Sequence, residues 1–345
     1  MKKKLLSSIK IFAALGLGVL VIWLSVRNIT PSQKTDIINS FKIANYWWVI
    51  LSIIIGILSH LMRAIRWKML LEPMGYKPST WTAFLAVMIG YFTNLGIPRS
   101  GEVARCSILF KEDKIPVDKS FGTVILERSI DMIIFFSLFF ITLTTQYKYL
   151  DHYVQTEIYP EVNKKFAFIS TEHLFGNTAL ILFAATVVVF YVSRKRIFAS
   201  KIWKKTTKLL GGIWEGLISI TKIKQPILFI IYSLGIWFFY YLMVYFCLFS
   251  LPETASMEMV VGLSVLVIGS IGIMVTPGGI GLYPVLVAET LYLYGISKEA
   301  GTGIAIGWIT WTAQTLMIIV VGAISLLIVS AHSKKKHVVL SENKS

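Results

Sequence analysis

Long stretches without Asp, Glu, Lys or Arg alternate along the chain with short charged segments. Beyond an apolar run at 11–26, seven such stretches occupy residues 45–62, 78–98, 132–147, 177–193, 225–252, 259–288 and 300–331. An α-helix needs about 20 residues to cross the roughly 30 Å hydrocarbon core of a bilayer. The pattern therefore predicts an all-α integral membrane protein with about six full transmembrane helices.

Two of the apolar stretches do not fit simple crossing. The stretch 78–98 lies between basic clusters at 63–68 and 105–119, so a full span would place one cluster outside. We therefore expect residues 78–104 to enter from the cytoplasm, break near Asn94–Pro98 and return as a re-entrant hairpin.

The second half has a corresponding break, at Thr276–Gly281 between apolar segments at 259–275 and 282–294. The number of membrane crossings on either side of this hairpin requires it to begin and end outside the cytoplasm. Broken helices at matching places in two halves are typical of inverted-repeat transporters. The interpretation is one membrane domain, 1–331, with repeat halves at about 1–170 and 171–331 and a basic polar tail at 332–345.

Charged loops predict the orientation. The loop 194–224 holds nine Lys or Arg residues against Glu215 alone, and lysines also cluster at the N-terminus and in the tail. Short basic loops stay in the cytoplasm. No cleavage site follows the first apolar run, so we expect a retained anchor, both termini in the cytoplasm, and the cytoplasmic membrane of a bacterium as the location.

Composition supports the membrane class. Hydrophobic residues make up 55% of the chain and charged residues 15%, with a mean hydropathy of +0.70. A soluble domain carries about 25% charged residues. The net charge of +16 follows the topology, which favours contact with anionic lipids over nucleic acid. Cys106 and Cys247 have no partner at metal-ligand spacing, and no nucleotide-binding or zinc motif occurs, so no cofactor or metal is expected.

The first candidate site is the arginine pair Arg63 and Arg66, three residues apart and thus on one helical face, followed by Trp67. Arginine forks bind phosphate with two hydrogen bonds, which suits a phospholipid headgroup. The alternative is that both side chains extend to the headgroup region and only fix topology.

The second candidate surrounds the first predicted break and comprises Asn94, Pro98, Arg99, Gly101, Glu102 and Arg105. A proline break leaves unpaired backbone groups, and a helix that starts after it presents N–H groups that attract anions. Arg99 and Arg105 add positive charge, so the pattern favours an anion site. In the alternative, Glu102 neutralises one of these arginines in a structural ion pair.

The third candidate, Glu127, Arg128 and Asp131, lies within an expected span, where each charge costs about 2.5–3.5 kcal/mol. Spacing predicts that Glu127 and Asp131 share a face and that Arg128 pairs with Asp131. We expect Arg99 or Arg105 to meet Glu127 or Asp131 in a polar cleft. A rigid structural network is the alternative.

The fourth candidate is the second break, with Pro277, Gly278, Gly279 and Gly281. Its glycines allow close backbone approach or expose amides to a ligand, whereas close helix packing through small residues is the alternative. Tyr283, Glu289 and Gln314 could complete a polar wall.

These four motifs, in this order, resemble the lysylphosphatidylglycerol synthase transmembrane family, which includes the flippase half of the multiple peptide resistance factor. The resemblance covers about residues 10–330. It implies a membrane domain that moves a lipid between leaflets, with the matching polar residues lining its cavity. Where the family pattern leads us to expect a glutamate after the glycines, this chain has Pro284, and Glu289 is a possible substitute.

The resemblance implies a flippase or transporter for a phospholipid, an aminoacyl-phospholipid or a lipid-linked glycan. Because no aminoacyl-transferase domain follows the membrane part, the resemblance also implies that this chain does not synthesise lysyl-lipid itself. Expected partners are membrane lipids with anionic headgroups, and a second copy or a separate lipid-modifying enzyme is possible. The alternatives are a membrane-embedded transferase with Glu127 or Asp131 as general base, and a structural assembly protein.

Overall fold

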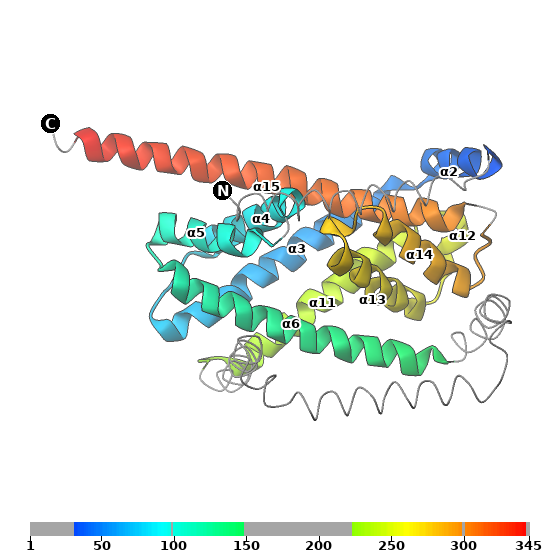
Figure 1. The fold of residues 1–345 in the computed structure, drawn as a ribbon, viewed down its shortest axis with the longest axis horizontal. Helices are drawn as coiled ribbons and strands as arrows, with labels where there is room; N and C mark the ends of the chain where they lie inside the picture. The colour runs from blue at the N-terminus through cyan, green and yellow to red at the C-terminus, as the bar shows by residue number, and fades with distance from the viewer. Residues whose placement is uncertain (1–30, 98, 148–222, 299–300, 343–345) are drawn as a thin grey trace, which may run out of the picture. The chain divides into compact units, whose positions relative to one another are not determined.

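The computed structural model describes residues 31–97, 99–147, 223–298 and 301–342. The predicted N-terminal anchor, the stretch at 177–193 and the charged segments at 148–172 and 194–222 lie outside these residues. The described helices belong to one compact unit, except that the last three residues of α6, 143–145, fall in the second unit. Every regular element among the described residues is helical, which agrees with the predicted class (Figure 1).

Three described helices are long and apolar enough to cross a membrane. They are α3 (Tyr46–Leu71), α11 (Pro226–Leu248) and the first part of α15 (Thr302–Glu342). Helix α6 (Val117–Thr145) is 29 residues long and carries the charges of the third candidate site in its first half. At a rise of about 1.5 Å per residue it is longer than the roughly 30 Å core of a bilayer.

Both predicted breaks are present. Helix α4 (Thr80–Gly96) is followed after a short turn by α5 (Gly101–Asp113), and the two helices pack together. Helix α13 (Met259–Val275) leads through the 3-10 turn η5 (Pro277–Gly279) into α14 (Leu282–Leu293), which packs against α13. The chain therefore contains two helical hairpins at the predicted positions.

Helix α3 packs along α11 and is joined to it by hydrogen bonds from small polar side chains. The Ser52 hydroxyl donates to the carbonyl of Met243 at 2.7 Å, and the Ser59 hydroxyl donates to that of Ile236 at 3.3 Å. Such bonds are a common means of joining helices inside a bilayer. Helix α3 also contacts α4 from the first hairpin.

Helix α15 contacts α4 and α14, and therefore joins the two hairpins. Glycines permit this close approach, since a Cβ on Gly307 would lie 2.5 Å from the carbonyl oxygen of Pro284. A Cβ on Gly322 would likewise lie 2.5 Å from Phe92 Cβ. Pro284, at the position where a glutamate was expected, therefore packs against α15.

The sequence pattern missed some helical structure. Helix α2 (Pro31–Ile43) and the single-turn helices η1 (Glu72–Met74) and α12 (Pro252–Ala255) lie in or beside charged segments for which the sequence pattern predicts no helix. Helix α15 continues to Glu342, through most of the residues expected to form a polar tail. No proline or glycine follows Ala331 to end it, so the backbone continues in helical geometry past the apolar stretch.

Candidate functional site

A buried carboxylate, Glu127 of α6, is the centre of the site. Its Oε1 accepts hydrogen bonds from Arg63 Nη1 and Arg66 Nη2 of α3, each at 3.0 Å. Its Oε2 accepts one from Arg105 Nη2 of α5 at 2.6 Å. The side chains of Glu127 and Arg66 are 0% exposed. One carboxylate therefore joins three arginines from two other helices.

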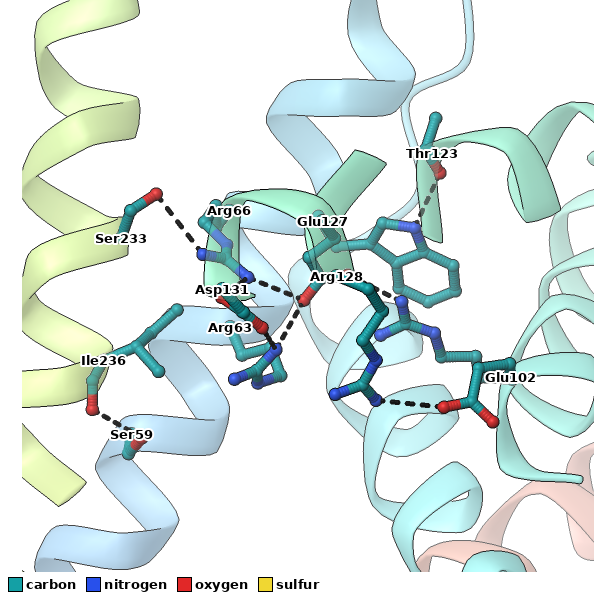
Figure 2. Close-up of polar contacts among 12 residues, drawn as sticks. Ser59, Arg63, Arg66, Glu102, Thr123, Glu127, Arg128, Asp131, Ser233 and Ile236 are labelled. Atoms are coloured by element: carbon teal, nitrogen blue, oxygen red, sulfur yellow. Dashed lines mark hydrogen bonds and ion pairs between the residues drawn. The ribbon is translucent and has the colours of Figure 1, made fainter. Parts of the chain in front are cut away.

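Asp131 lies one turn further along α6 and binds the same two arginines of α3. Arg63 Nη1 donates to Asp131 Oδ2 at 2.6 Å, and Arg66 Nη2 forms an ion pair with Oδ1 at 2.8 Å. Figure 2 shows the four side chains converging between the two helices. The spacings of three residues on α3 and four on α6 place both pairs on facing sides.

Neighbouring polar and aromatic groups hold the arginines in place. Arg66 donates to Ser233 of α11 at 3.3 Å. Arg105 lies over the ring of Trp67 at 4.4 Å, and the Trp67 indole N–H donates to Thr123 at 2.9 Å. Arginine over tryptophan is a favourable cation–π geometry.

A cluster of hydroxyl and imidazole groups adjoins Arg63. Its Nη2 donates to the Tyr240 hydroxyl at 3.3 Å, which lies 3.4 Å from the Tyr91 hydroxyl. The ring of His60 packs against that of Tyr91 at 4.5 Å between centroids, and no described residue forms a hydrogen bond with His60 Nδ1. Polar groups thus continue from the ion network to α4 and α11.

The rim of the network is a separate, partly exposed ion pair. Arg128 Nη2 lies 3.3 Å from Glu102 Oε1, and the two side chains are 40% and 22% exposed. The predicted pairing of Arg128 with Asp131 is wrong, because α3 supplies both partners of Asp131 and Arg128 turns toward α5. In the structure Glu102 pairs with Arg128, and not with Arg99 or Arg105 as the structural alternative supposed.

Other predictions for the arginines have mixed outcomes. Of the two expected at the carboxylates, Arg105 reaches Glu127, whereas Arg99 is exposed at the tip of the first hairpin with a left-handed backbone, φ 63°. Arg63 and Arg66 are buried and paired in the middle of the unit. Their burial and their pairing with α6 favour a network over side chains that only extend to the headgroup region.

The charges of the buried network do not balance. Arg63, Arg66 and Arg105 face Glu127 and Asp131, which leaves one positive charge among these five side chains. The Nε atoms of all three arginines are buried and lack a hydrogen-bond partner within the described part of the chain. A buried donor without an acceptor is destabilising, and the network combines three such donors with one formal positive charge.

At the first break, Asn94 and Gly101 turn out to join the two helices of the hairpin. The Asn94 side chain accepts a hydrogen bond at 2.7 Å from the N–H of Gly101, the first residue of α5. A Cβ on Gly101 would collide with the carbonyl oxygen of Gly90. Both residues therefore stabilise the turn that positions Arg105. Pro98 lies outside the described residues.

At the second break, glycine geometry dominates. Gly278, Gly279 and Gly281 have φ values of 62°, 75° and 74°, in the region that favours glycine. The carbonyl of Gly278 accepts a hydrogen bond from the Trp311 indole at 2.8 Å, and a Cβ on Gly278 would lie 3.2 Å from Leu95 Cδ2. The tips of the two hairpins therefore touch.

The expected polar wall is only partly present. Gln314 donates to the Tyr283 hydroxyl at 3.4 Å, near the second break. Glu289 instead lies 4.0 Å from Lys298, and both side chains are about half exposed. Among the described residues, no group of three His, Cys, Asp or Glu side chains is placed to hold a metal ion.

Sequence reasoning missed His60, Ser233 and Tyr240. A signal existed for His60, which stands one turn before Arg63 within an apolar stretch. Ser233 and Tyr240 lie in a stretch with no charge, and only the packing of α11 against α3 reveals their role.

Comparison with known proteins places these residues in a family. The model of the lysylphosphatidylglycerol synthase transmembrane region matches residues 11–334. The chain belongs to that family. A UPF0104 membrane protein of Methanocaldococcus jannaschii is 25% identical to this family member over 304 residues, which cover 84% of the chain and 87% of the relative. No solved structure gave a significant match.

Proposed function

We propose that this protein is a lipid flippase or transporter that moves a lipid with a phosphate-bearing headgroup between the leaflets of the cytoplasmic membrane. The observation that carries the proposal is the buried cluster of Arg63, Arg66 and Arg105 with its single excess positive charge. Charges at membrane depth are expensive and face a polar path in most membrane proteins. Family membership supports the same class of function.

The substrate in this proposal is a phosphodiester lipid. A guanidinium fork matches two phosphate oxygens, and a phosphodiester carries one negative charge, which balances the excess charge of the network. Glu127 and Asp131 hold the arginines while the site is empty. They are partly displaced when the phosphate binds, so the buried charges keep a partner throughout the cycle.

Access in the proposal comes from the two hairpins. The first, with Asn94, Pro98, Arg99 and Gly101 at its turn, opens to the cytoplasm. The second, with Pro277, Gly278, Gly279 and Gly281 at its turn, opens outward. Arg128 and Glu102, which are partly exposed, form the rim where a headgroup enters. The N- and C-termini lie in the cytoplasm.

The test is lipid transfer in liposomes that contain the purified protein. Headgroup-labelled phosphatidylglycerol, phosphatidylethanolamine, lysyl-phosphatidylglycerol and a diphosphate-linked polyprenyl glycan are compared, and their arrival in the opposite leaflet is measured. We expect transfer of at least one phosphodiester lipid by the wild type and a large loss in Asp131→Asn. Absence of transfer for every lipid would exclude a flippase.

A matched control is available on the same helix. Asp118 is exposed in the first turn of α6, and Asp118→Asn removes the same charge outside the network. We expect its transfer rate to equal that of the wild type. An equal loss in both variants would show that the network has no specific role in transfer.

A further inference from the structure

An apolar groove of about 400 Å³ lies between α6, α11 and α13. Its volume falls within the roughly 300–1,000 Å³ of small-molecule sites. Hydrocarbon and aromatic side chains line it, namely Ile134, Leu138, Leu234, Trp237, Phe238, Tyr241, Met259, Val260, Leu263 and Leu266. The groove is separate from the ion network but shares two helices with it.

On α6 the groove continues directly from the network. Asp131, Ile134 and Leu138 follow each other at spacings of three and four residues, which places them on one face of the helix. Asp131 binds the arginines, whereas Ile134 and Leu138 line the groove. A single helical face therefore changes from charged to apolar within one turn.

On α11 the junction is Trp237. Its ring borders the groove and packs edge-on against Tyr240, with 6.0 Å between centroids and 81° between planes. The Tyr240 hydroxyl in turn accepts the hydrogen bond from Arg63. Trp237 thus contacts a member of the polar cluster and also lines the groove.

The indole N–H of Trp237 is buried and has no hydrogen-bond partner among the residues that the structure describes. A buried N–H without an acceptor is destabilising, and native structures seldom leave one unpaired. In a glycerophospholipid, ester carbonyls lie between the phosphate and the hydrocarbon chains. Because the indole N–H has almost no exposed area, the ring must turn slightly toward the groove to meet such an acceptor when the phosphate lies at the arginines.

We propose that the groove holds one hydrocarbon chain of the transported lipid and that Trp237 donates to the ester carbonyl of this chain. The inference rests on the proposed function and narrows its substrate to an ester-linked glycerophospholipid. The occupants that it excludes are the apolar stretches 11–26 and 177–193 of this chain and a helix of a second copy.

The test places a photo-crosslinking residue, p-benzoylphenylalanine, at Leu263 in the groove. The control position is Ile231, which is exposed on α11 and does not line the groove. The protein is reconstituted in equal amounts of diester phosphatidylglycerol, its dialkyl ether analogue and diacylglycerol. After illumination, mass spectrometry identifies what each position captured.

At Leu263 we expect capture of phosphatidylglycerol in excess over diacylglycerol, and at Ile231 capture in proportion to the bulk lipid. We also expect the diester to exceed the diether by about five-fold, the ratio given by one net hydrogen bond. In Trp237→Phe, which keeps the ring but removes the N–H, this preference should disappear.

Capture of peptide from this chain or a second copy at Leu263, or capture there in bulk proportion, would overturn the chain site. Equal capture of diester and diether by the wild type would overturn the role of Trp237. Transfer between leaflets is measured in the same liposomes. Transfer without capture in the groove would refute only the inference about the groove. Absence of transfer would refute the proposed function.

Discussion

At the residue scale, Glu127 explains how three arginines are accommodated inside an apolar helical unit. Each of its oxygens lies within hydrogen-bond distance of guanidinium groups, and Asp131 adds a second carboxylate for the two arginines of α3. Removing one partner from such a group leaves the others charged in a poorly solvated place. The stability of the site therefore depends more on Glu127 than on any single arginine.

Replacing Glu127 by Gln should destabilise the protein strongly. The change leaves three buried guanidinium groups with one carboxylate, and breaking a buried pair costs about 3–5 kcal/mol. Thermal unfolding in detergent measures the effect. The control Glu102→Gln removes a carboxylate from the partly exposed rim pair, where solvent screens the charges and the loss should be smaller. Equal effects would contradict the central role of Glu127.

The sequence identified the charged members of the network but not all of their pairings. Arg63, Arg66, Arg105, Glu127 and Asp131 stood out because charges within apolar stretches need compensation. Which arginine meets which carboxylate depends on the rotation of α3, α5 and α6 about their axes. Local spacing suggested that Arg128 pairs with Asp131, but Arg63 and Arg66 compete successfully for the same carboxylate.

At the element scale, α6 is held mainly by long side chains. Its polar links to α3 and α5 include the arginine network, the pair of Arg128 with Glu102 and the bond from Trp67 to Thr123. Helices α4 and α15, by contrast, approach closely through glycine. A helix held by polar side chains can shift when a ligand exchanges those contacts, whereas closely packed helices move together.

The close contact between α14 and α15 gives a prediction for Gly307. A Cβ there would lie 2.5 Å from the carbonyl oxygen of Pro284, so Gly307→Ala must push the helices apart. We expect a loss of about 1–3 kcal/mol in the free energy of unfolding, as for other overpacked sites. Denaturant unfolding in mixed micelles measures it.

Gly122 of α6 is the matched control, because a Cβ there would meet nothing within 4 Å. Gly122→Ala should leave stability unchanged or raise it by up to about 1 kcal/mol through better helix propensity. A larger loss in Gly122→Ala than in Gly307→Ala would contradict the packing described here.

The positions of both hairpins could be predicted because proline and glycine interrupt the apolar stretches at Asn94–Pro98 and Thr276–Gly281. The contact between their tips could not, because Leu95 and Gly278 carry no signal of proximity in the sequence. The continuation of α15 past Ala331 was missed for a different reason, since hydropathy detects the end of an apolar stretch and not the end of a helix.

At the scale of the whole molecule, the orientation of the two hairpins remains a prediction that can be tested directly. Ser79, before α4, and Ser256, before α13, are exposed in the structure. A single cysteine placed at either position can therefore be labelled. The native Cys106 and Cys247 are buried and should react slowly. In intact cells an impermeant maleimide should label Ser256→Cys but not Ser79→Cys.

The other end of the first hairpin gives the decisive comparison. Lys114→Cys, after α5, should share the protection of Ser79→Cys, because a re-entrant hairpin returns to the face from which it entered. Protection of one position and labelling of the other would mean that α4 and α5 together cross the membrane. The inverted arrangement of the two halves would then be wrong.

The excess positive charge of the network also has an electrical consequence. Moving one elementary charge through a potential of 100 mV changes the free energy by about 2.3 kcal/mol. In the proposed cycle the empty site carries this charge, whereas a bound phosphodiester cancels it. An inside-negative voltage would draw only the empty site toward the cytoplasmic face, where it reloads, and would thereby give the transport a direction.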